Sequence, residues 1–91
     1  MKEKEFYVSL KQKLEEQHSF PALYLFKFII PADNQKLAQV EALFGAEAQV
    51  STNQSKTNKY ISISAKEIMI SADSIIDVYK EAEKIEGIIS L

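Results

Sequence analysis

The single histidine, His18, is the first residue to test for chemistry, because imidazole can accept and donate a proton near neutral pH. A catalytic histidine needs a nucleophile or an orienting carboxylate beside it. Glu15, Glu16 and Ser19 are only its sequence neighbours, at the end of a predicted helix. We therefore expect His18 to be an exposed residue at a helix end, where the helix dipole favours it, and predict no catalytic role.

Three carboxylates at helical spacing form the second candidate site. Asp73, Asp77 and Glu81 follow one another at i, i+4 and i+8. Hard cations such as Mg²⁺ require oxygen ligands that converge, whereas side chains along one exposed helix face diverge into water. Lys80 and Lys84 lie close by in the sequence and complete a solvated, charged face. The spacing predicts no metal site.

Nucleophilic and phosphate-binding motifs are missing from the sequence. None of the frequent serines (Ser62, Ser64, Ser71, Ser74) lies in a G-x-S-x-G turn. The only glycines are Gly45 and Gly87, so the sequence contains neither of the phosphate-binding motifs G-x-x-x-x-G-K-[ST] and G-x-G-x-x-G. There is also no cysteine to serve as nucleophile or metal ligand. The sequence therefore predicts a protein that is not an enzyme and that needs no cofactor.

Composition indicates a small globular protein. A length of 91 residues suits one domain, residues 1–91, with a single core. The net charge of −2 provides no positive field for a polyanion, which disfavours nucleic acid as a partner. The N-terminal stretch lacks the apolar run of a signal peptide or membrane span. Together with the absence of cysteine, this leads us to expect a cytoplasmic protein without membrane contact.

The elements that position these residues follow from hydrophobic periodicity. Residues 2–17 are predicted to form a helix with Phe6, Leu10 and Leu14 on its apolar stripe and Tyr7 beside it. After Phe20-Pro21, residues 22–30 alternate as a strand that is apolar on both faces. A helix with Asp33 as N-cap and Gly45 at the C′ position is expected next.

A hairpin is predicted in the second half of the chain. Residues 46–53 read as an edge strand with a polar outer row, and the polar residues 54–58 lead into a central strand over residues 59–70. Its inward positions, Ile61, Ile63 and Ala65, are followed by Glu67, where an apolar residue is expected. A bulge near residues 66–67, or the end of the strand, would turn Ile68 and Ile70 into the apolar positions.

A last helix and strand complete the order. Ser71 is expected to cap a helix that ends at Gly87, and residues 88–91 to form the terminal strand. After the N-terminal helix, residues 20–91 thus read strand, helix, strand, strand, helix, strand. This order favours an α+β fold, the ferredoxin-like βαββαβ sandwich, with a four-stranded antiparallel sheet and two helices on one face.

The second face of this sheet is the most informative surface that the sequence predicts. Its residues mix apolar, hydroxyl and lysine side chains, a composition that marks an interface when it stays exposed. The expected interface or ligand surface comprises Leu23, Leu25, Lys27, Ile29, Tyr60, Ser62 and Ser64, with Lys66 beside them. Two alternatives give this face no separate function. The N-terminal helix could cover it through Phe6, Leu10 and Leu14, or two copies of the chain could dimerise through the sheet.

With these residues in view, the chain resembles the YbeD-like family of small bacterial proteins, a domain of unknown function. The resemblance covers residues 20–91. It depends on Phe20-Pro21, Phe26-Lys27, Gln54-Ser55-Lys56, residues 58–64 and 75–79, and the closing Gly87-Ile88-Ile89-Ser90-Leu91. The family is placed near the ACT-like regulatory modules, which bind small effectors at interfaces. Modules of that kind that bind amino acids carry a glycine-containing turn after the first strand, whereas residues 31–36 contain no glycine.

The resemblance implies a non-catalytic regulatory or adaptor role. The expected partners are a second copy or another protein, and in addition a small effector. Two alternatives remain open: an RNA-binding module, because RNA-recognition domains share this strand and helix order, and a purely structural dimerisation domain. Tyr60 is the only aromatic residue expected on the outward row of its strand, whereas RNA-recognition domains stack bases on several rings.

Overall fold

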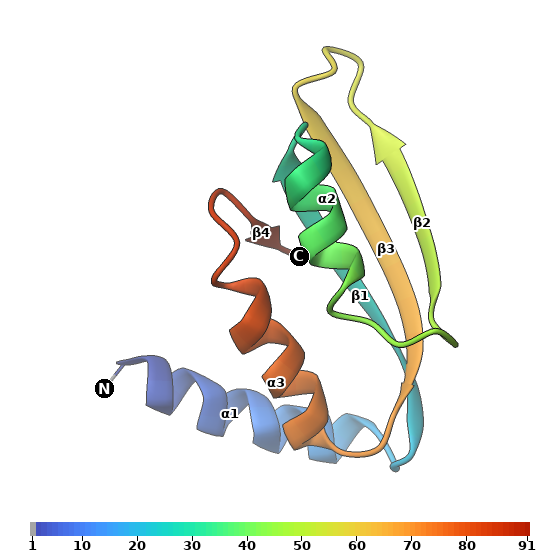
Figure 1. Ribbon diagram of the computed structural model, residues 1–91. Coiled ribbons are helices and arrows are strands. Elements are labelled where there is room, and N and C mark those ends of the chain that lie inside the picture. Colours follow the sequence, from blue (N-terminus) through green and yellow to red (C-terminus); the bar gives the residue numbers. More distant parts are fainter. Residues whose placement is uncertain (1) are drawn as a thin grey trace.

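The computed structural model describes the backbone of residues 2–91 and the side chains of residues 5–91. Over this range the chain forms three helices and four strands (Figure 1). In chain order they are α1 (Lys2–Gln17), β1 (Ala22–Pro31), α2 (Asn34–Glu41), β2 (Gln49–Gln54), β3 (Tyr60–Met69), α3 (Ala72–Ala82) and β4 (Ile89–Ser90). Every element predicted from the sequence is present, and the predicted α+β fold is confirmed.

The four strands form one antiparallel sheet in the order β2-β3-β1-β4. The central strands β1 and β3 pair along their full length, from Ala22 opposite Met69 to Pro31 opposite Tyr60. β4 is short and pairs only with Phe28 and Ile29, so the first half of β1 lacks a strand on that side. Sequence alternation placed both central strands correctly, because a period of two fixes which residues share a face.

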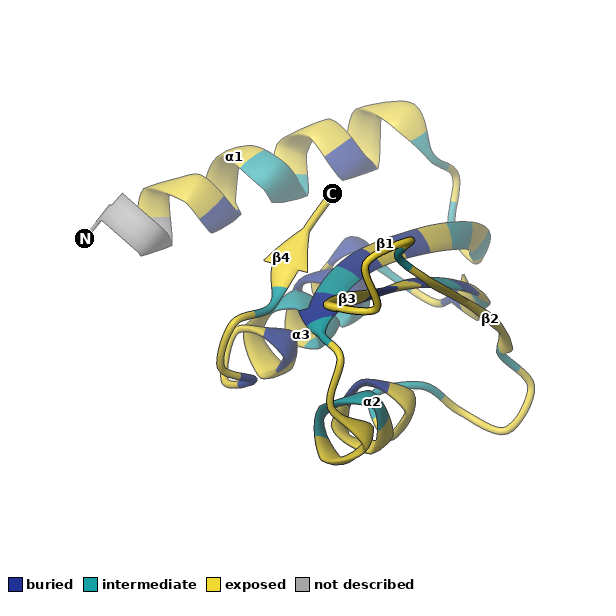
Figure 2. Cartoon of the chain, turned by 90° about the horizontal axis from the view of Figure 1, so that it is seen from above, coloured by how far each residue is buried: buried dark blue, intermediate teal, exposed yellow. Residues whose placement is uncertain are grey.

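The core lies between one face of this sheet and the helices. Phe26, Phe28 and Ile30 of β1 are fully buried, as are Ile63 of β3 and Ile75 of α3. Aromatic rings fill the centre: the Phe26 ring lies 5.4 Å from both the Phe44 and Tyr79 rings, centroid to centroid. Figure 2 shows buried residues gathered where α3 meets the sheet. This packing leaves the other sheet face without a helix of the βαββαβ core.

Both core helices begin with the predicted caps. The Asp33 carboxylate accepts hydrogen bonds from the backbone N–H groups of Gln35 and Lys36, and Ser71 forms a reciprocal capping box with Ser74. These side chains satisfy N–H groups that have no partner within the helix. Two of the serines considered for chemistry are therefore structural.

The predicted role of Gly45 is wrong, for a local reason. α2 ends at Glu41 and its C-cap is Ala42, so Gly45 lies beyond the helix, and its φ angle is not positive. Its N–H instead donates to the Glu67 carboxylate at 2.9 Å, and a Cβ at this position would lie 2.7 Å from Glu67 Oε2. Glycine here lets the end of the Glu67 side chain approach the backbone closely, and it does not form a left-handed cap.

Gly87 does adopt the left-handed conformation, with φ +82°. The prediction that the last helix ends at Gly87 is wrong, because α3 ends at Ala82 and turns over residues 83–87 lead the chain into β4. A Cβ here would lie 2.9 Å from Cγ of Pro31, at the end of β1. The turn thus brings the C-terminal strand close to β1, as its position in the sheet requires.

The bulge expected near residues 66–67 is absent. β1 and β3 stay in continuous register through Lys66 and Glu67, and Met69 is the buried residue of the last inward position. Glu67 fits on the inward side because its carboxylate reaches the Gly45 N–H at the edge of the core. Ile68 and Ile70 are consequently exposed.

α1 packs against α3 and not against the second sheet face. Leu14 and Tyr7 are its buried residues, Leu10 is half-buried, and Phe6 is 60% exposed. The Tyr7 hydroxyl donates to Glu83, and Lys11 Nζ lies 3.2 Å from Asp73 Oδ2. Figure 2 shows α1 and α2 on opposite sides of the molecule, with α3 between them. The predicted stripe is therefore rotated toward Tyr7, which takes the buried place expected for Phe6.

Candidate functional site

The candidate site is the sheet face that the core helices leave free, here called the open face. The pairing register decides its members: residues opposite one another in neighbouring strands share a face. Leu25 is opposite Lys66, Lys27 is opposite Ser64, and Ile29 is opposite Ser62. The predicted surface residues therefore do lie on one face, which is completed by Leu23, Tyr60 and Ile68 on the central strands, Gln49, Ser51 and Asn53 on β2, and Ile89 on β4.

Large apolar side chains on the open face are exposed. Leu23 is 62% exposed and Leu25 42%, and Ile68, directly opposite Leu23, is 67% exposed. Ile70, just beyond the end of β3, is 76% exposed. Tyr60 at the other end of β3 and Ile89 on β4 are exposed too, while Ile29 is half-buried. These residues form a surface that is apolar near the C-terminal end of β3 and more polar toward β2.

Sequence reasoning missed Ile68, Ile70 and Ile89 as part of this surface. The change of alternation predicted after Glu67 assigned Ile68 and Ile70 to the apolar positions of the strand. Strict counting by two from Ile61 reaches Met69, which would have placed Ile68 outward. Ile89 carried no such signal, because a strand as short as β4 has too few residues to show a period.

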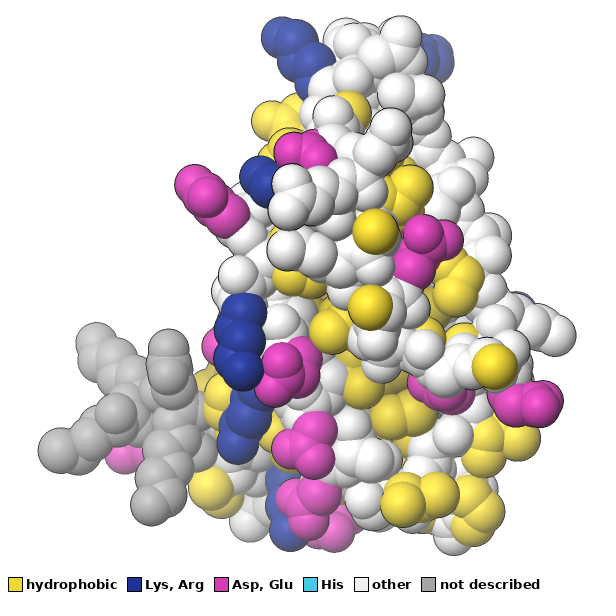
Figure 3. All heavy atoms as spheres, viewed as in Figure 1, with side chains coloured by type: hydrophobic (Ala, Val, Ile, Leu, Met, Phe, Trp, Pro, Cys, Tyr) yellow, Lys and Arg dark blue, Asp and Glu magenta, His cyan; other side chains and the backbone are white. Residues whose placement is uncertain are grey.

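The outward strand positions of the open face carry charges of one sign. Lys27 and Lys66 are its only charged strand residues, and no Asp or Glu occupies an outward position of β1, β2, β3 or β4. The other side of the molecule differs: Figure 3 shows acidic side chains over α3, which contains Asp73, Asp77 and Glu81. In a chain with a net charge of −2, the outward positions of these strands are thus positive, and the carboxylates of this face lie in its larger hollow.

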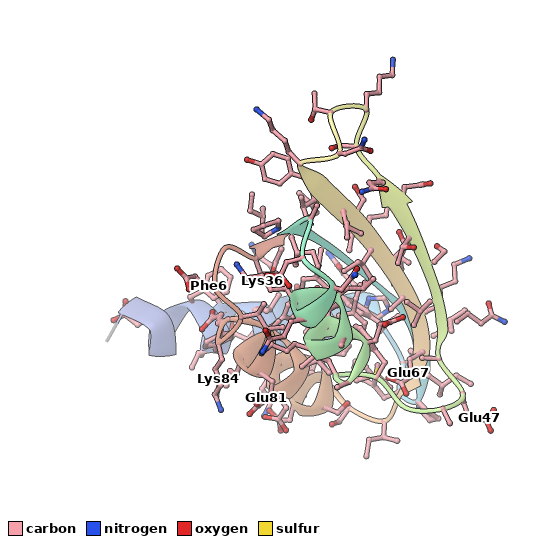
Figure 4. The ribbon with its side chains drawn as sticks, turned by 45° about the horizontal axis from the view of Figure 1, so that its top comes forward. Phe6, Lys36, Glu47, Glu67, Glu81 and Lys84 are labelled. Atoms are coloured by element: carbon pink, nitrogen blue, oxygen red, sulfur yellow. The ribbon has the colours of Figure 1, made fainter. Side chains whose placement is uncertain are left out.

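Two shallow hollows mark the open face, and Lys66 lines both. The larger, about 460 Å³, is lined by two carboxylates as well as a lysine and apolar residues: Leu23, Glu47, Gln49, Lys66, Glu67 and Ile68. Figure 4 shows these two carboxylates at the end of the sheet where β2 begins and β3 finishes. The smaller hollow, about 200 Å³, lies between Leu25 and β2. Apolar side chains of a partner could enter beside a lysine that binds a carboxylate.

Comparison with known protein families gives a match for this chain. A family described as "Protein of unknown function (DUF493)" matches residues 15–91, which is most of the sequence. The chain belongs to this family. The resemblance recognised from the sequence is thereby confirmed, and the match begins within the last turn of α1. No curated protein and no solved structure gives a significant match to this DUF493 protein.

His18 lies away from the open face of this DUF493 protein. Its ring is half-buried beside two aromatic rings, with centroids 6.1 Å from Phe20 and 5.7 Å from Tyr24. The expectation of an exposed histidine is therefore wrong: the chain turns back after α1 and brings Phe20 and Tyr24 against the ring. Its surroundings are aromatic, with no carboxylate or nucleophile placed beside it by any contact that the structure describes.

Two of the three acidic residues of α3 form separate ion pairs. Asp73 pairs with Lys11 of α1, and Glu81 lies 3.0 Å from Lys84 in the turn that follows α3. Among residues 5–91 no three His, Asp or Glu side chains converge in a way that could hold a metal ion. Within the same residues, no helix has the length and apolar character needed to cross a membrane.

Proposed function

We propose that this DUF493 protein is a non-catalytic binding domain, regulatory or adaptor in role, whose open face docks a partner protein. One observation carries the proposal: large apolar side chains stay exposed around Lys27 and Lys66 on strands that carry no carboxylate outward. Exposed apolar surface of this kind is costly for a free domain and is typical of an interaction site.

The chemistry of the face defines the partner segment. Leu23, Leu25 and Ile68 favour apolar side chains opposite them, and Lys66, between the two hollows, favours a carboxylate. A segment that alternates apolar residues with Asp or Glu would meet both requirements. Lys27 offers a second cation on the neighbouring strand, so we expect at least two carboxylates in the bound segment.

A second copy of the chain fits this face less well. Docking two open faces would place Lys27 and Lys66 of both copies in one interface, and the outward strand positions supply no carboxylate to pair with them. Like charges brought together at an interface disfavour the wrong partner. The absence of a second ring beside Tyr60 in the central strands likewise gives little support to base stacking on this face.

Site-specific photocrosslinking in cells tests the proposal. A benzophenone amino acid is placed at position 25 or 68 on the open face, with position 39 on the exposed side of α2 as the control. We expect one heterotypic adduct from positions 25 and 68 and none from position 39. Mass spectrometry of the crosslinked peptide should reveal carboxylates next to apolar residues.

Charge reversal gives the matched specificity control. Lys66→Glu on the open face should abolish the adduct, whereas Lys84→Glu, in the exposed turn after α3, should leave it unchanged. An adduct made only with a second copy would overturn the proposal in favour of dimerisation. An adduct with RNA that weakens steeply with salt would overturn it in favour of nucleic-acid binding. Equal adducts from all three probe positions would show that the contact is nonspecific.

A further inference from the structure

A separate cavity lies on the helix side of the sheet, where α1, β1, α3 and the C-terminal residues meet. Its volume is about 370 Å³, within the range of about 300 to 1,000 Å³ that small-molecule sites occupy. The residues that line it come from both ends of the sequence: Phe6, Tyr7, Leu10, Tyr24, Tyr79, Glu83, Ser90 and Leu91. No motif in the sequence indicates this site, because only the docking of α1 on α3 brings its walls together.

Aromatic rings dominate the walls. Phe6 and Tyr7 of α1 lie edge to face with centroids 5.3 Å apart, and Tyr24 and Tyr79 do so at 6.4 Å on the opposite wall. The face of an aromatic ring is electronegative and attracts an organic cation within about 6 Å. Tyr7 already interacts in this way, since Lys80 Nζ lies 5.1 Å from its ring centroid, outside the cavity.

The charge of the cavity has the sign that suits a cation. Among the lining residues that the structure describes, Glu83 is the only charged one, and its carboxylate accepts a hydrogen bond from the Tyr7 hydroxyl. That bond fixes the carboxylate at the junction of α1 and α3. A carboxylate beside aromatic rings disfavours an anionic ligand, and none of the lining residues within 5–91 is a lysine that would offset it.

Neutral hydroxyl groups complete the site. The Tyr24 and Tyr79 hydroxyls lie 3.0 Å apart, so one donates to the other. Burial, and secondly the hydrogen bond with Tyr24, raise the pKa of Tyr79, which keeps its hydroxyl protonated. Each tyrosine has one O–H proton, and the second proton of this pair has no acceptor among the described side-chain hydrogen bonds. It is available to a ligand.

We propose that this cavity binds a small organic cation, an amine or quaternary ammonium compound with an apolar body. The rings and the Glu83 carboxylate hold the charged group, Leu10 and Leu91 contact the apolar part, and the tyrosine pair offers a hydrogen bond. Because α1 and the C-terminal residues both line the cavity, the bound cation would stabilise α1 on α3. The cavity and the open face lie on opposite sides of the sheet, so either proposal can fail alone.

NMR titration of the full chain with paired probes tests this site. Choline, tetramethylammonium and benzyltrimethylammonium are the cations, and 3,3-dimethyl-1-butanol is the neutral analogue of choline. We expect saturable shifts at Tyr7, Tyr24, Tyr79 and Leu91 with at least one cation, and at least tenfold weaker binding of the alcohol than of choline. Equal binding of choline and its neutral analogue would overturn the proposal, as would a lack of shifts with all three cations.

Two glutamine variants separate the role of charge from that of shape. Glu83→Gln keeps an oxygen that can accept the Tyr7 hydroxyl proton but removes the negative charge, and should weaken cation binding at least tenfold. Glu81→Gln removes the same charge from the solvent side of α3, where Glu81 pairs with Lys84, and should change the affinity less than twofold (Figure 4). Equal losses in both variants would indicate a general field effect and overturn the assigned site.

Discussion

Tyr79 shows at the residue scale how packing alters the chemistry of one side chain. Its ring lies among those of Tyr24, Phe26 and Phe28, with centroids between 5.4 and 6.4 Å away. Burial disfavours the phenolate and raises the pKa of Tyr79 above its ordinary value of 10.0, and the hydrogen bond with Tyr24 adds to this effect. The native protein therefore holds this proton more tightly than the unfolded chain does.

This linkage predicts a loss of stability at high pH. Below pH 10 both states keep the proton and Tyr79 contributes no pH dependence, whereas above it the unfolded chain loses the proton first, which favours unfolding. In Tyr79→Phe this part of the pH dependence should disappear. Denaturant unfolding between about pH 8 and 11 measures it, and the stability difference between wild type and variant should shrink as pH rises.

Tyr60→Phe is the matched control, because Tyr60 is an exposed tyrosine at the end of β3. It should leave the slope of stability against pH unchanged. Parallel curves for wild type and Tyr79→Phe across the alkaline range would contradict the assignment of the linkage to Tyr79.

The two glycines show how far residue types alone lead. Both were predicted to end helices, since glycine commonly follows a helix in the left-handed conformation. Neither glycine directly follows its helix, since α2 ends at Glu41 and α3 ends at Ala82, but Gly87 has a positive φ angle and Gly45 does not. Gly45 instead lies where the carboxylate of Glu67, far away in the sequence, approaches its backbone. A contact across that distance leaves no local pattern, so only the tertiary structure distinguishes the two roles.

At the scale of elements, α1 is the part whose position the sequence could not decide. Its spacing allowed either Phe6 or Tyr7 on the buried stripe, because both fit the helical period with Leu10 and Leu14. The contacts with α3 decide in favour of Tyr7, through Glu83 and through Lys80 over its ring. The open face consequently stays exposed, and the alternative that α1 covers it is wrong.

One leucine variant and one phenylalanine variant of α1 test this orientation. Leu14 is 3% exposed, so Leu14→Ala should lower the free energy of unfolding by about 2 to 4 kcal/mol. Phe6→Ala removes a larger but mostly exposed side chain, and should cost less than about 1 kcal/mol. Denaturant unfolding measures both. A larger loss for Phe6→Ala than for Leu14→Ala would mean that α1 is rotated relative to this structure.

The strands were more predictable than α1, because their alternation is a strict local pattern. The register of β1 and β3 placed all seven predicted surface residues on one face: Leu23, Leu25, Lys27, Ile29, Tyr60, Ser62 and Ser64. The error at Glu67 came from treating a charged residue at an inward position as a break in the strand. Its partner, the Gly45 N–H, was invisible to periodicity. The cavity at α1 was equally invisible, since it joins residues from both ends of the chain.

At the scale of the whole molecule, the two sides carry different sets of charges. Carboxylates and lysines both lie over α3, whereas the only charged residues at outward strand positions are Lys27 and Lys66 (Figure 3). The apolar residues around these lysines would otherwise favour association of two open faces. Under the proposed function, repulsion between the lysines of two copies would act against self-association and would leave the face free for a partner that carries carboxylates.

This charge repulsion predicts how the wild-type protein should associate with a charge-reversed variant. In the double variant Lys27→Glu/Lys66→Glu the open face is negative, so it should repel itself but attract the wild-type face. Light scattering of an equimolar mixture should give a higher average mass than either protein alone, and added salt should reduce the difference, because salt screens exposed charges. Lys80→Glu/Lys84→Glu, with both changes on the helix side, should not associate with wild type in this way. If wild type alone were already dimeric and lost its dimer in Leu25→Asp, the lysines would not be the barrier, and the open face would be a homodimer interface.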